Sequence, residues 1–199
     1  MKRIVIASNN KHKIKEISQI LCNYELLTLE EIGYSQDIDE TGTTFLENAL
    51  IKAKTINRFL KEKGITADVL SDDSGLCVNS LHGAPGIYSA RYGKENNSKS
   101  NRDRLLSELE SYEDRRAYFT CTMVLYHPND TYESSVGNTE GIILKQERGN
   151  TDFGYDCIFF SLELNKSFGE ATDKEKNAVS HRGKALTALL KSIHEKKDQ

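Results

Sequence analysis

The sequence predicts an α/β protein in which a mixed β-sheet is flanked by helices. Segments that alternate apolar and polar residues are interleaved with segments of helical periodicity. A hairpin pattern over 117–136 argues against a purely parallel sheet. The 199 residues contain no internal repeat and no linker-like tract, so we expect one domain over residues 1–199.

Each predicted element follows from a local pattern. The clearest helix begins at Thr44, which forms a capping-box pattern with Glu47, and it ends before Gly64. A strand over 117–127 turns at 128–130 into a partner strand. Residues 94–101 have the composition of an exposed loop. The other predicted elements are strands at 3–7, 69–70, 76–78, 131–136, 142–144 and 157–160 and helices at 11–21, 102–109 and from a Ser180 cap onward.

Composition excludes several classes of protein. Thirty acidic and twenty-seven basic residues give a net charge of −3, so no general positive field attracts nucleic acid or anionic lipid. The apolar run at 4–7 is too short for a signal sequence or a membrane span, and we expect a cytoplasmic protein. Four cysteines without a C-x-x-C pair predict buried thiols rather than disulfides or zinc.

The first polar cluster, at 7–13, lies between the first strand and the first helix. Hydroxyl, amide and helix N-terminal N–H groups there can bind phosphate oxygens, and Lys13 adds positive charge. It is not a Walker A loop, because the G-x-x-x-x-G-K-[ST] pattern is absent. The structural alternative is an Asn-rich helix cap beside two solvated lysines.

The second cluster begins at 39–44 and continues onto the following helix. Glu40 lies just before the cap, and Asn48 and Lys52 are four residues apart and therefore share a helical face. One side of this segment can thus offer both a carboxylate and an amine. The structural alternative is a helix cap followed by a solvated helix face.

The third cluster is Asp72-Asp73-Ser74-Gly75, after an apolar strand. Adjacent carboxylates repel each other and are costly to remove from water, so a cation is expected nearby. Mg²⁺ is the simplest such partner. The alternative is an ordinary turn, because Asp, Ser and Gly are frequent turn residues.

The fourth cluster combines residues 153–156 and 180–183. Aromatic rings followed by a carboxylate can stack on a purine and hydrogen-bond to it, and Arg182 can donate to a ring carbonyl. The alternative places Phe153 and Tyr155 in the core.

Taken in chain order, these clusters resemble the inosine/xanthosine triphosphate pyrophosphatases of the HAM1/RdgB family. The resemblance covers nearly the whole chain, and the run at 83–92 has no general structural explanation at that length. The matching stretches are A-S-N-N-K-H-K (7–13), E-T-G-T-T-F-L-E-N-A (40–49) with Lys52, S-D-D-S-G-L (71–76), G-A-P-G-I-Y-S-A-R-Y (83–92), F-G-Y-D (153–156) and S-H-R-G-K-A-L (180–186).

The resemblance implies hydrolysis of ITP, dITP and XTP to the monophosphate and pyrophosphate, with Mg²⁺ as cofactor. It also implies a homodimer and an elongated mixed sheet with two lobes around a central substrate cleft. Glu40 and Asp73 would hold the metal, and Asp73 would be the catalytic proton acceptor. The residues implied to contact substrate are Ser8, Asn9, Asn10, Lys11, His12, Lys13, Ser74, Phe153, Gly154, Tyr155, Asp156, Lys176, His181 and Arg182.

On this hypothesis water attacks the α-phosphorus and pyrophosphate leaves. Lys13, Lys52 and Lys176 would take up the charge that develops on the leaving group. A buried donor to the 6-keto oxygen of the purine would reject adenine, because a 6-amino group leaves that donor unpaired. Two alternatives remain: a Maf-like pyrophosphatase for pyrimidine or modified nucleotides, and a nucleotide-sensing module without catalysis.

Overall fold

The computed structural model describes residues 3–95 and 97–197 and contains a seven-stranded sheet. The sheet has the strand order β2-β1-β3-β4-β5-β6-β7. β1 pairs in parallel with β2 and β3, whereas β6 is antiparallel to β5 and β7, so the sheet is mixed as predicted. The strands are β1 (Arg3–Ile6), β2 (Glu25–Leu27), β3 (Asp68–Val78), β4 (Arg116–Tyr126), β5 (Tyr132–Ile143), β6 (Phe159–Ser161) and β7 (Lys166–Ser167).

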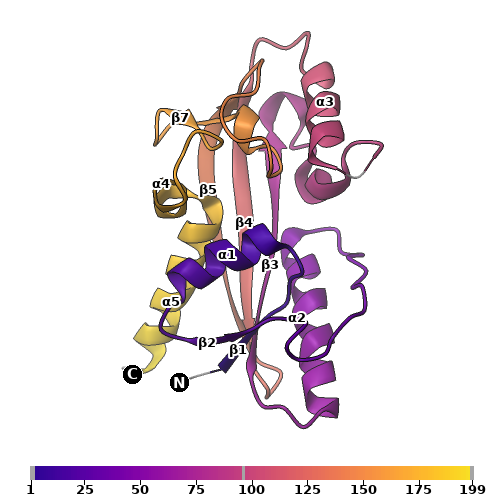
Figure 1. Cartoon of the computed structure of the whole chain (residues 1–199), viewed down its shortest axis with the longest axis vertical. Helices are drawn as coiled ribbons and strands as arrows, with labels where there is room; N and C mark the ends of the chain where they lie inside the picture. Colours follow the sequence, from indigo (N-terminus) through magenta and orange to yellow (C-terminus); the bar gives the residue numbers. More distant parts are fainter. Residues whose placement is uncertain (1–2, 96, 198–199) are drawn as a thin grey trace. The chain divides into compact units, whose positions relative to one another are not determined.

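Helices flank this sheet, which confirms the predicted fold class (Figure 1). The α-helices are α1 (Lys11–Ile20), α2 (Phe45–Glu62), α3 (Ser98–Glu108), α4 (Asp173–Val179) and α5 (His181–Lys197). Short 3-10 helices are η1 (Asn79–Leu81), η2 (Gly86–Arg91) and η3 (Asp156–Ile158). No helix within residues 3–95 and 97–197 combines the length and apolarity needed to cross a membrane.

The chain forms two compact units. The first comprises Met1–Asp73, Cys121–Gly137 and Arg182–Gln199, and the second comprises Ser74–Thr120 and Asn138–His181. The unit boundaries fall inside β3, β4 and β5 and after the first residue of α5, so each unit is built from separate segments of the chain. The elongated shape and the substrate cleft implied by the resemblance stay predictions.

The first unit has a hydrophobic core on each face of its strands. On one face α2 packs through Ala49, Ala53 and Ile56 against Val5 and Val69. The opposite face carries α1 and α5, as Figure 1 shows. Residues of that second core are Ile4, Ile6, Ile17, Leu21, Leu70, Cys121, Met123, Leu125, Ala185, Leu186 and Leu189. Because successive strand residues point to opposite faces, this alternation fixes the face of every polar residue that follows on β3.

The core of the second unit is aromatic. The ring centroids of Phe119 and Phe159 are 4.6 Å apart, and those of Phe159 and Phe168 are 5.0 Å apart. Leu105 of α3 and Leu76 of β3 are fully buried in the same core. These contacts order the segments that carry the fourth polar cluster.

Several sequence predictions are confirmed. Thr44 caps α2 and accepts a hydrogen bond from the Glu47 N–H at 3.1 Å, and Gly64 follows the helix with a positive φ of 67°. The Glu47 side chain, however, accepts from the backbone N–H of Thr43 at 2.7 Å rather than from Thr44. In the predicted capping box the Glu47 side chain would accept from the N–H of Thr44; here it accepts from the N–H of the preceding residue, Thr43.

The third cluster is not a turn, which corrects one alternative for it. Residues 68–78 form a single strand, and Gly75 lies inside it. A Cβ at Gly75 would lie 2.2 Å from the Gly86 carbonyl oxygen and 2.7 Å from Ser89 Oγ. This glycine is therefore needed for close backbone approach, not for a turn.

Other boundaries differ because caps and tertiary contacts override composition. The predicted loop at 94–101 contains the start of α3, since the Asn97 side chain accepts from the Ser100 N–H and caps that helix. The predicted strands 131–136 and 142–144 are parts of one strand, β5. Residues 156–158 are 3-10 helix before β6. Cys22 is exposed, contrary to the prediction of buried thiols, while the other three cysteines are buried.

Candidate active site

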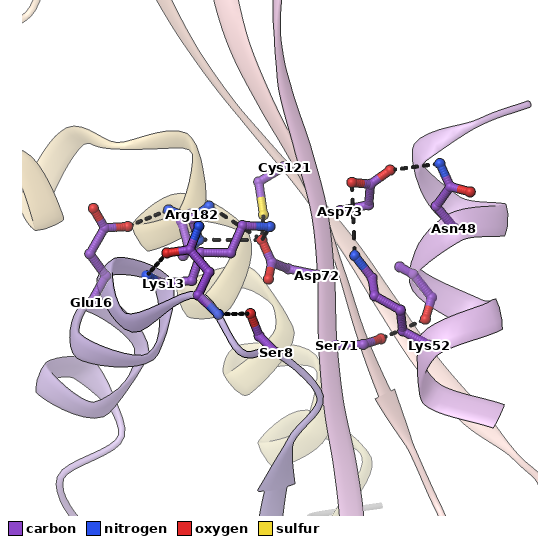
Figure 2. A network of polar contacts seen from close by, with 12 residues as sticks. Ser8, Lys13, Glu16, Asn48, Lys52, Ser71, Asp72, Asp73, Cys121 and Arg182 are labelled. Atoms are coloured by element: carbon purple, nitrogen blue, oxygen red, sulfur yellow. Dashed lines mark hydrogen bonds and ion pairs between the residues drawn. The ribbon is translucent and has the colours of Figure 1, made fainter. Parts of the chain in front are cut away.

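β3 carries Asp72 and Asp73 on its two faces (Figure 2). Val69 packs on the α2 side and Leu70 on the α1 and α5 side. The same alternation places Asp73 toward α2 and Asp72 toward α1 and α5. The pleat separates the two carboxylates, and basic side chains lie near each one: Lys52 near Asp73, and Lys13 with Arg182 near Asp72. Mg²⁺ as the cation near this pair stays a prediction.

On the α2 side, three charged residues converge. Lys52 Nζ lies 3.0 Å from Glu40 Oε1 and 3.9 Å from Asp73 Oδ1. The Asp73 side chain is only 8% exposed, whereas that of Glu40 is 28% exposed. The two carboxylates predicted to hold a metal thus lie around one ammonium group, with Glu40 on the more open side.

Burial raises the pKa of Asp73 above its ordinary value of 3.8. The positive charges of Lys52 and Lys13 act in the opposite direction, and the negative charge of Glu40 raises the pKa further. A carboxylate with a raised pKa holds a proton more strongly than an ordinary aspartate does. Asp73 is accordingly suited to accept a proton from water.

The other face of β3 holds a buried ion-pair network. Asp72 Oδ2 lies 2.9 Å from Lys13 Nζ and 3.3 Å from Arg182 Nη2, and the Arg182 guanidinium also contacts Glu16. Burial alone would raise the pKa of Asp72, but Lys13 and Arg182 outweigh it and hold that pKa far below 3.8. Asp72 is therefore a permanent anion that orients two cations. Cys121 Sγ, at 3.8 Å, completes its surroundings.

The loop before α1 forms the predicted Asn-rich cap. Asn10 Oδ1 accepts from the backbone N–H groups of His12 and Lys13, at 3.0 and 3.2 Å. Ser8 Oγ accepts from the Asn10 N–H at 3.1 Å. Asn9, Asn10, Lys11 and His12 are exposed, while Ser8 and Lys13 are half-buried. The cap of the structural alternative is thus present, but only Lys11 is solvated, because Lys13 pairs with the buried Asp72. Phosphate binding by residues 8–13 stays a prediction.

The second unit contains residues 153–156 of the fourth cluster together with Lys176, whereas Arg182 belongs to the first unit. Lys176 Nζ lies 2.5 Å from Asp156 Oδ2 and 4.9 Å from the centre of the Phe153 ring. Gly154 has a positive φ of 52°, and its carbonyl accepts from Arg102 Nη1 at 2.8 Å. Arg102 thus holds the loop at Gly154, and the ammonium group of Lys176, on α4, lies over the face of the Phe153 ring.

Other residues of this cluster are largely enclosed. The Tyr155 hydroxyl donates to the Ser89 carbonyl at 2.7 Å, and Tyr155 is 4% exposed, as the core alternative predicts, whereas Phe153 is only half-buried. The His181 ring stacks on Phe119 with centroids 4.7 Å apart. Ser74, which belongs to the third cluster, is half-buried in β3. Their contacts with substrate stay predictions.

Sequence reasoning assigned no role to Glu16. It also did not predict that Asp72 pairs with Lys13 and Arg182 or that Asn48 contacts Asp73. Glu16 follows Lys13 by three residues on α1, a spacing that signals a shared helical face. The link from Glu16 to Arg182 spans 166 residues and has no local signal.

The sequence is similar to that of known proteins over nearly its whole length. The model of the Ham1 family matches residues 4–192. The chain belongs to the Ham1 family. A "dITP/XTP pyrophosphatase" of Clostridium perfringens is 46% identical, over 97% of this chain and 98% of that protein. The protein of the same name from Bacillus subtilis is 40% identical, over 97% and 98%.

Solved structures of Ham1 proteins have the same fold. The Staphylococcus aureus Ham1 protein superimposes with a TM-score of 0.85 at 37% identity, over 98% of this chain and all of that one. A HAM1 protein from Coxiella burnetii gives a TM-score of 0.83 at 38% identity, over 98% and 100%. The α/β fold predicted from the sequence is thus confirmed for this Ham1 chain.

The donor set of this Ham1 chain fits a hard divalent cation. Glu40 and Asp73 offer carboxylate oxygens, and both already face the ammonium of Lys52. Among residues 3–95 and 97–197, no group of three or more His, Cys, Asp or Glu could hold a metal ion. Mg²⁺ suits such a sparse site, because it commonly binds through one or two carboxylates plus water and substrate phosphates.

Proposed function

We propose that this chain hydrolyses the non-standard purine nucleoside triphosphates ITP, dITP and XTP to the monophosphate and pyrophosphate, and so removes them from the nucleotide pool. The observation that carries this proposal is the convergence of Glu40, Lys52 and Asp73 beside β3. The names of the relatives support the choice of substrate.

Glu40 and Asp73 would hold Mg²⁺. When bound, the ion supplies positive charge to the phosphate oxygens. Asp73 orients a water molecule and accepts its proton, because its raised pKa makes it a stronger base than an exposed aspartate. Water then attacks the α-phosphorus, the α–β phosphoanhydride bond breaks, and pyrophosphate leaves.

Cationic side chains take up the charge that develops on the leaving group. Lys52 is already beside both carboxylates, and Lys13 is held at 2.9 Å by Asp72. Asp72 and Asp156 fix the ammonium groups of Lys13 and Lys176 before substrate arrives. Such preorganised charge is the main source of transition-state stabilisation in phosphoryl transfer.

Recognition of the base is assigned to the residues of the fourth cluster. Phe153, Gly154, Tyr155 and Asp156 contact the nucleotide together with His181 and Arg182. A donor to the 6-keto oxygen admits hypoxanthine and xanthine and rejects adenine.

A pyrophosphate-release assay tests the proposal with a panel of nucleoside triphosphates, with and without Mg²⁺. We expect Mg²⁺-dependent release from ITP, dITP and XTP and little from ATP. Preference for pyrimidine nucleotides would instead support a Maf-like activity. Saturable binding of ITP without release would support a sensing module.

The proposal includes a cytoplasmic homodimer. The location follows from the substrate, because nucleoside triphosphates are made and used in the cytoplasm. The dimer rests on the family resemblance alone, and light scattering of the purified protein tests it directly.

A further inference from the structure

Asn48 is a fully buried polar residue in the first turn of α2. Its Nδ2 donates to Asp73 Oδ2 at 3.0 Å, and its Oδ1 accepts from the Gly42 N–H at 2.8 Å. Figure 2 shows the amide reaching from α2 toward the Asp73 carboxylate. Helix capping does not explain this residue, because Thr44 caps α2.

The chemistry of the two partners fixes the orientation of this amide. An ionised carboxylate only accepts hydrogen bonds and a backbone N–H only donates one. Reversing the amide would place Oδ1 against Asp73 and Nδ2 against the Gly42 N–H, so both contacts would be lost. A primary amide supplies a donor and an acceptor at once, which neither an ionised Asp nor Leu can do.

The contact with Gly42 also depends on the lack of a side chain there. A Cβ at Gly42 would lie 2.7 Å from Asn48 Oδ1 and 2.9 Å from the backbone nitrogen of Asn48. Gly42 follows Glu40 by two residues, so the same amide that holds Asp73 also holds the loop bearing Glu40. The two carboxylates come from segments 33 residues apart in sequence (73 minus 40), and Asn48 is bonded to both segments.

We infer that Asn48 is a positioning residue that sets the orientation of the Asp73 carboxylate and its placement relative to the Glu40 loop. This inference rests on the proposed function. Asn48 engages Oδ2 of Asp73, and Oδ1 faces Lys52 at 3.9 Å. Without the amide, the carboxylate can rotate and the loop bond is lost, so the geometry needed for metal binding and water activation is no longer maintained.

Two substitutions separate positioning from folding. Asn48→Leu removes both hydrogen bonds at similar volume. Asn48→Asp retains an acceptor for Gly42 and replaces the donor to Asp73 with a second carboxylate that repels it, so it tests the proposal even if Asn48→Leu does not fold. The matched control is Asn57→Leu: Asn57 is 4% exposed on the same helix, and its amide donates to Asp130 at 3.0 Å.

The measurements are kcat and KM for ITP, unfolding by urea, and Mn²⁺ affinity by water-proton relaxation in the presence of an inosine triphosphate analogue with a non-hydrolysable α–β link. We expect kcat to fall at least tenfold in both Asn48 variants with KM within threefold. Mn²⁺ affinity falls roughly 10- to 100-fold in Asn48→Leu, as for other groups that orient metal ligands. Asn57→Leu lowers the urea midpoint and leaves kcat and Mn²⁺ affinity unchanged.

Wild-type kcat in a folded Asn48 variant would overturn the inference, as would an equal loss of kcat in Asn57→Leu. A wild-type protein that binds Mn²⁺ with the analogue but releases no pyrophosphate would contradict the proposed function alone. In that case the Mn²⁺ affinity of Asn48→Leu still decides the role of Asn48.

Discussion

The carboxylates of Asp72 and Asp73 lie on opposite faces of β3, because consecutive residues of a strand point to opposite faces. Asp73 faces Lys52 and the amide of Asn48, whereas Asp72 faces Lys13 and Arg182. These surroundings shift the two pKa values in opposite directions: the pKa of Asp73 is raised and the pKa of Asp72 is lowered. One carboxylate is suited to accept a proton, and the other stays charged as a fixed partner of cations.

Asp73→Asn should abolish turnover while leaving nucleotide binding largely intact. The amide keeps the shape of the side chain and removes the proton acceptor, and loss of a general base typically costs about 10²–10⁴-fold in rate. We expect kcat for ITP to fall by that amount and the Kd of the non-hydrolysable analogue to change by less than about fivefold. Equal loss of binding and turnover would indicate a structural role for Asp73.

Asp72→Asn should act on stability. Removing the anion leaves Lys13 and Arg182 without their common buried partner, and breaking a buried ion pair in this way costs about 3–5 kcal/mol. Urea unfolding at pH 7 measures the loss. The exposed pair of Lys99 and Asp103 provides a control, because Asp103→Asn should change stability by less than about 1 kcal/mol.

The difference in stability between the wild type and Asp72→Asn should depend on pH. The pKa of Asp72 in the folded protein lies below the ordinary value of 3.8, so its stabilisation is present above pH 3.8 and is lost as the pH falls. The difference in free energy of unfolding between the two proteins should therefore be constant near neutrality. Below pH 3.8 it should decrease by up to roughly 1.4 kcal/mol per pH unit. Unfolding curves between pH 7 and acid measure this, and a difference that increases in acid would contradict the assignment.

The sequence predicted the elements whose signals are local. Thr44 caps α2 as expected, because a cap depends on residues within one helical turn. The grouping of Glu40 with Lys52 was also accessible, since both lie near the start of that helix. The family resemblance added Asp73 to this group, and the structure brings it to 3.9 Å from Lys52.

The course of β3 could not be predicted from local composition. Asp, Ser and Gly favour a turn, but contacts with residues elsewhere in the chain hold Asp72 and Gly75 in a strand. Asp72 is held in the strand by Arg182, which is 110 residues away, and Gly75 is packed against the Gly86 carbonyl. Contacts of such sequence separation leave no periodic signal.

Arg182→Lys tests base recognition. The change retains the positive charge for Asp72 and Glu16 but loses the planar set of N–H donors, which the sequence analysis predicts to donate to a ring carbonyl of the base. We expect the ratio of kcat/KM for ITP to that for ATP to fall at least tenfold. Glu16→Gln is the control, because it weakens one partner of the guanidinium without removing it and should preserve the ratio. An unchanged ratio in a folded Arg182→Lys protein would show that another group reads the base.

Gly75→Ala should destabilise the second unit through steric overlap. The new Cβ would lie 2.2 Å from the Gly86 carbonyl oxygen and 2.7 Å from Ser89 Oγ. Ser89 Oγ also donates to Gly86 at 2.6 Å and accepts from the Leu76 N–H at 2.9 Å, so neither neighbour moves freely. Overpacking of this kind costs typically about 1–3 kcal/mol, and more where backbone must shift.

A double mutant identifies which overlap dominates in Gly75→Ala. Adding Ser89→Ala removes the Oγ overlap and leaves the closer backbone oxygen of Gly86 in place. Because that oxygen belongs to the main chain, we expect Gly75→Ala to remain destabilising by at least about 1 kcal/mol when it is introduced into a Ser89→Ala background. Urea unfolding of the wild type, both single mutants and the double mutant completes the cycle. If Gly75→Ala had no effect in the Ser89→Ala background, the Ser89 hydroxyl and not the backbone approach would be the reason for a glycine at this point of β3.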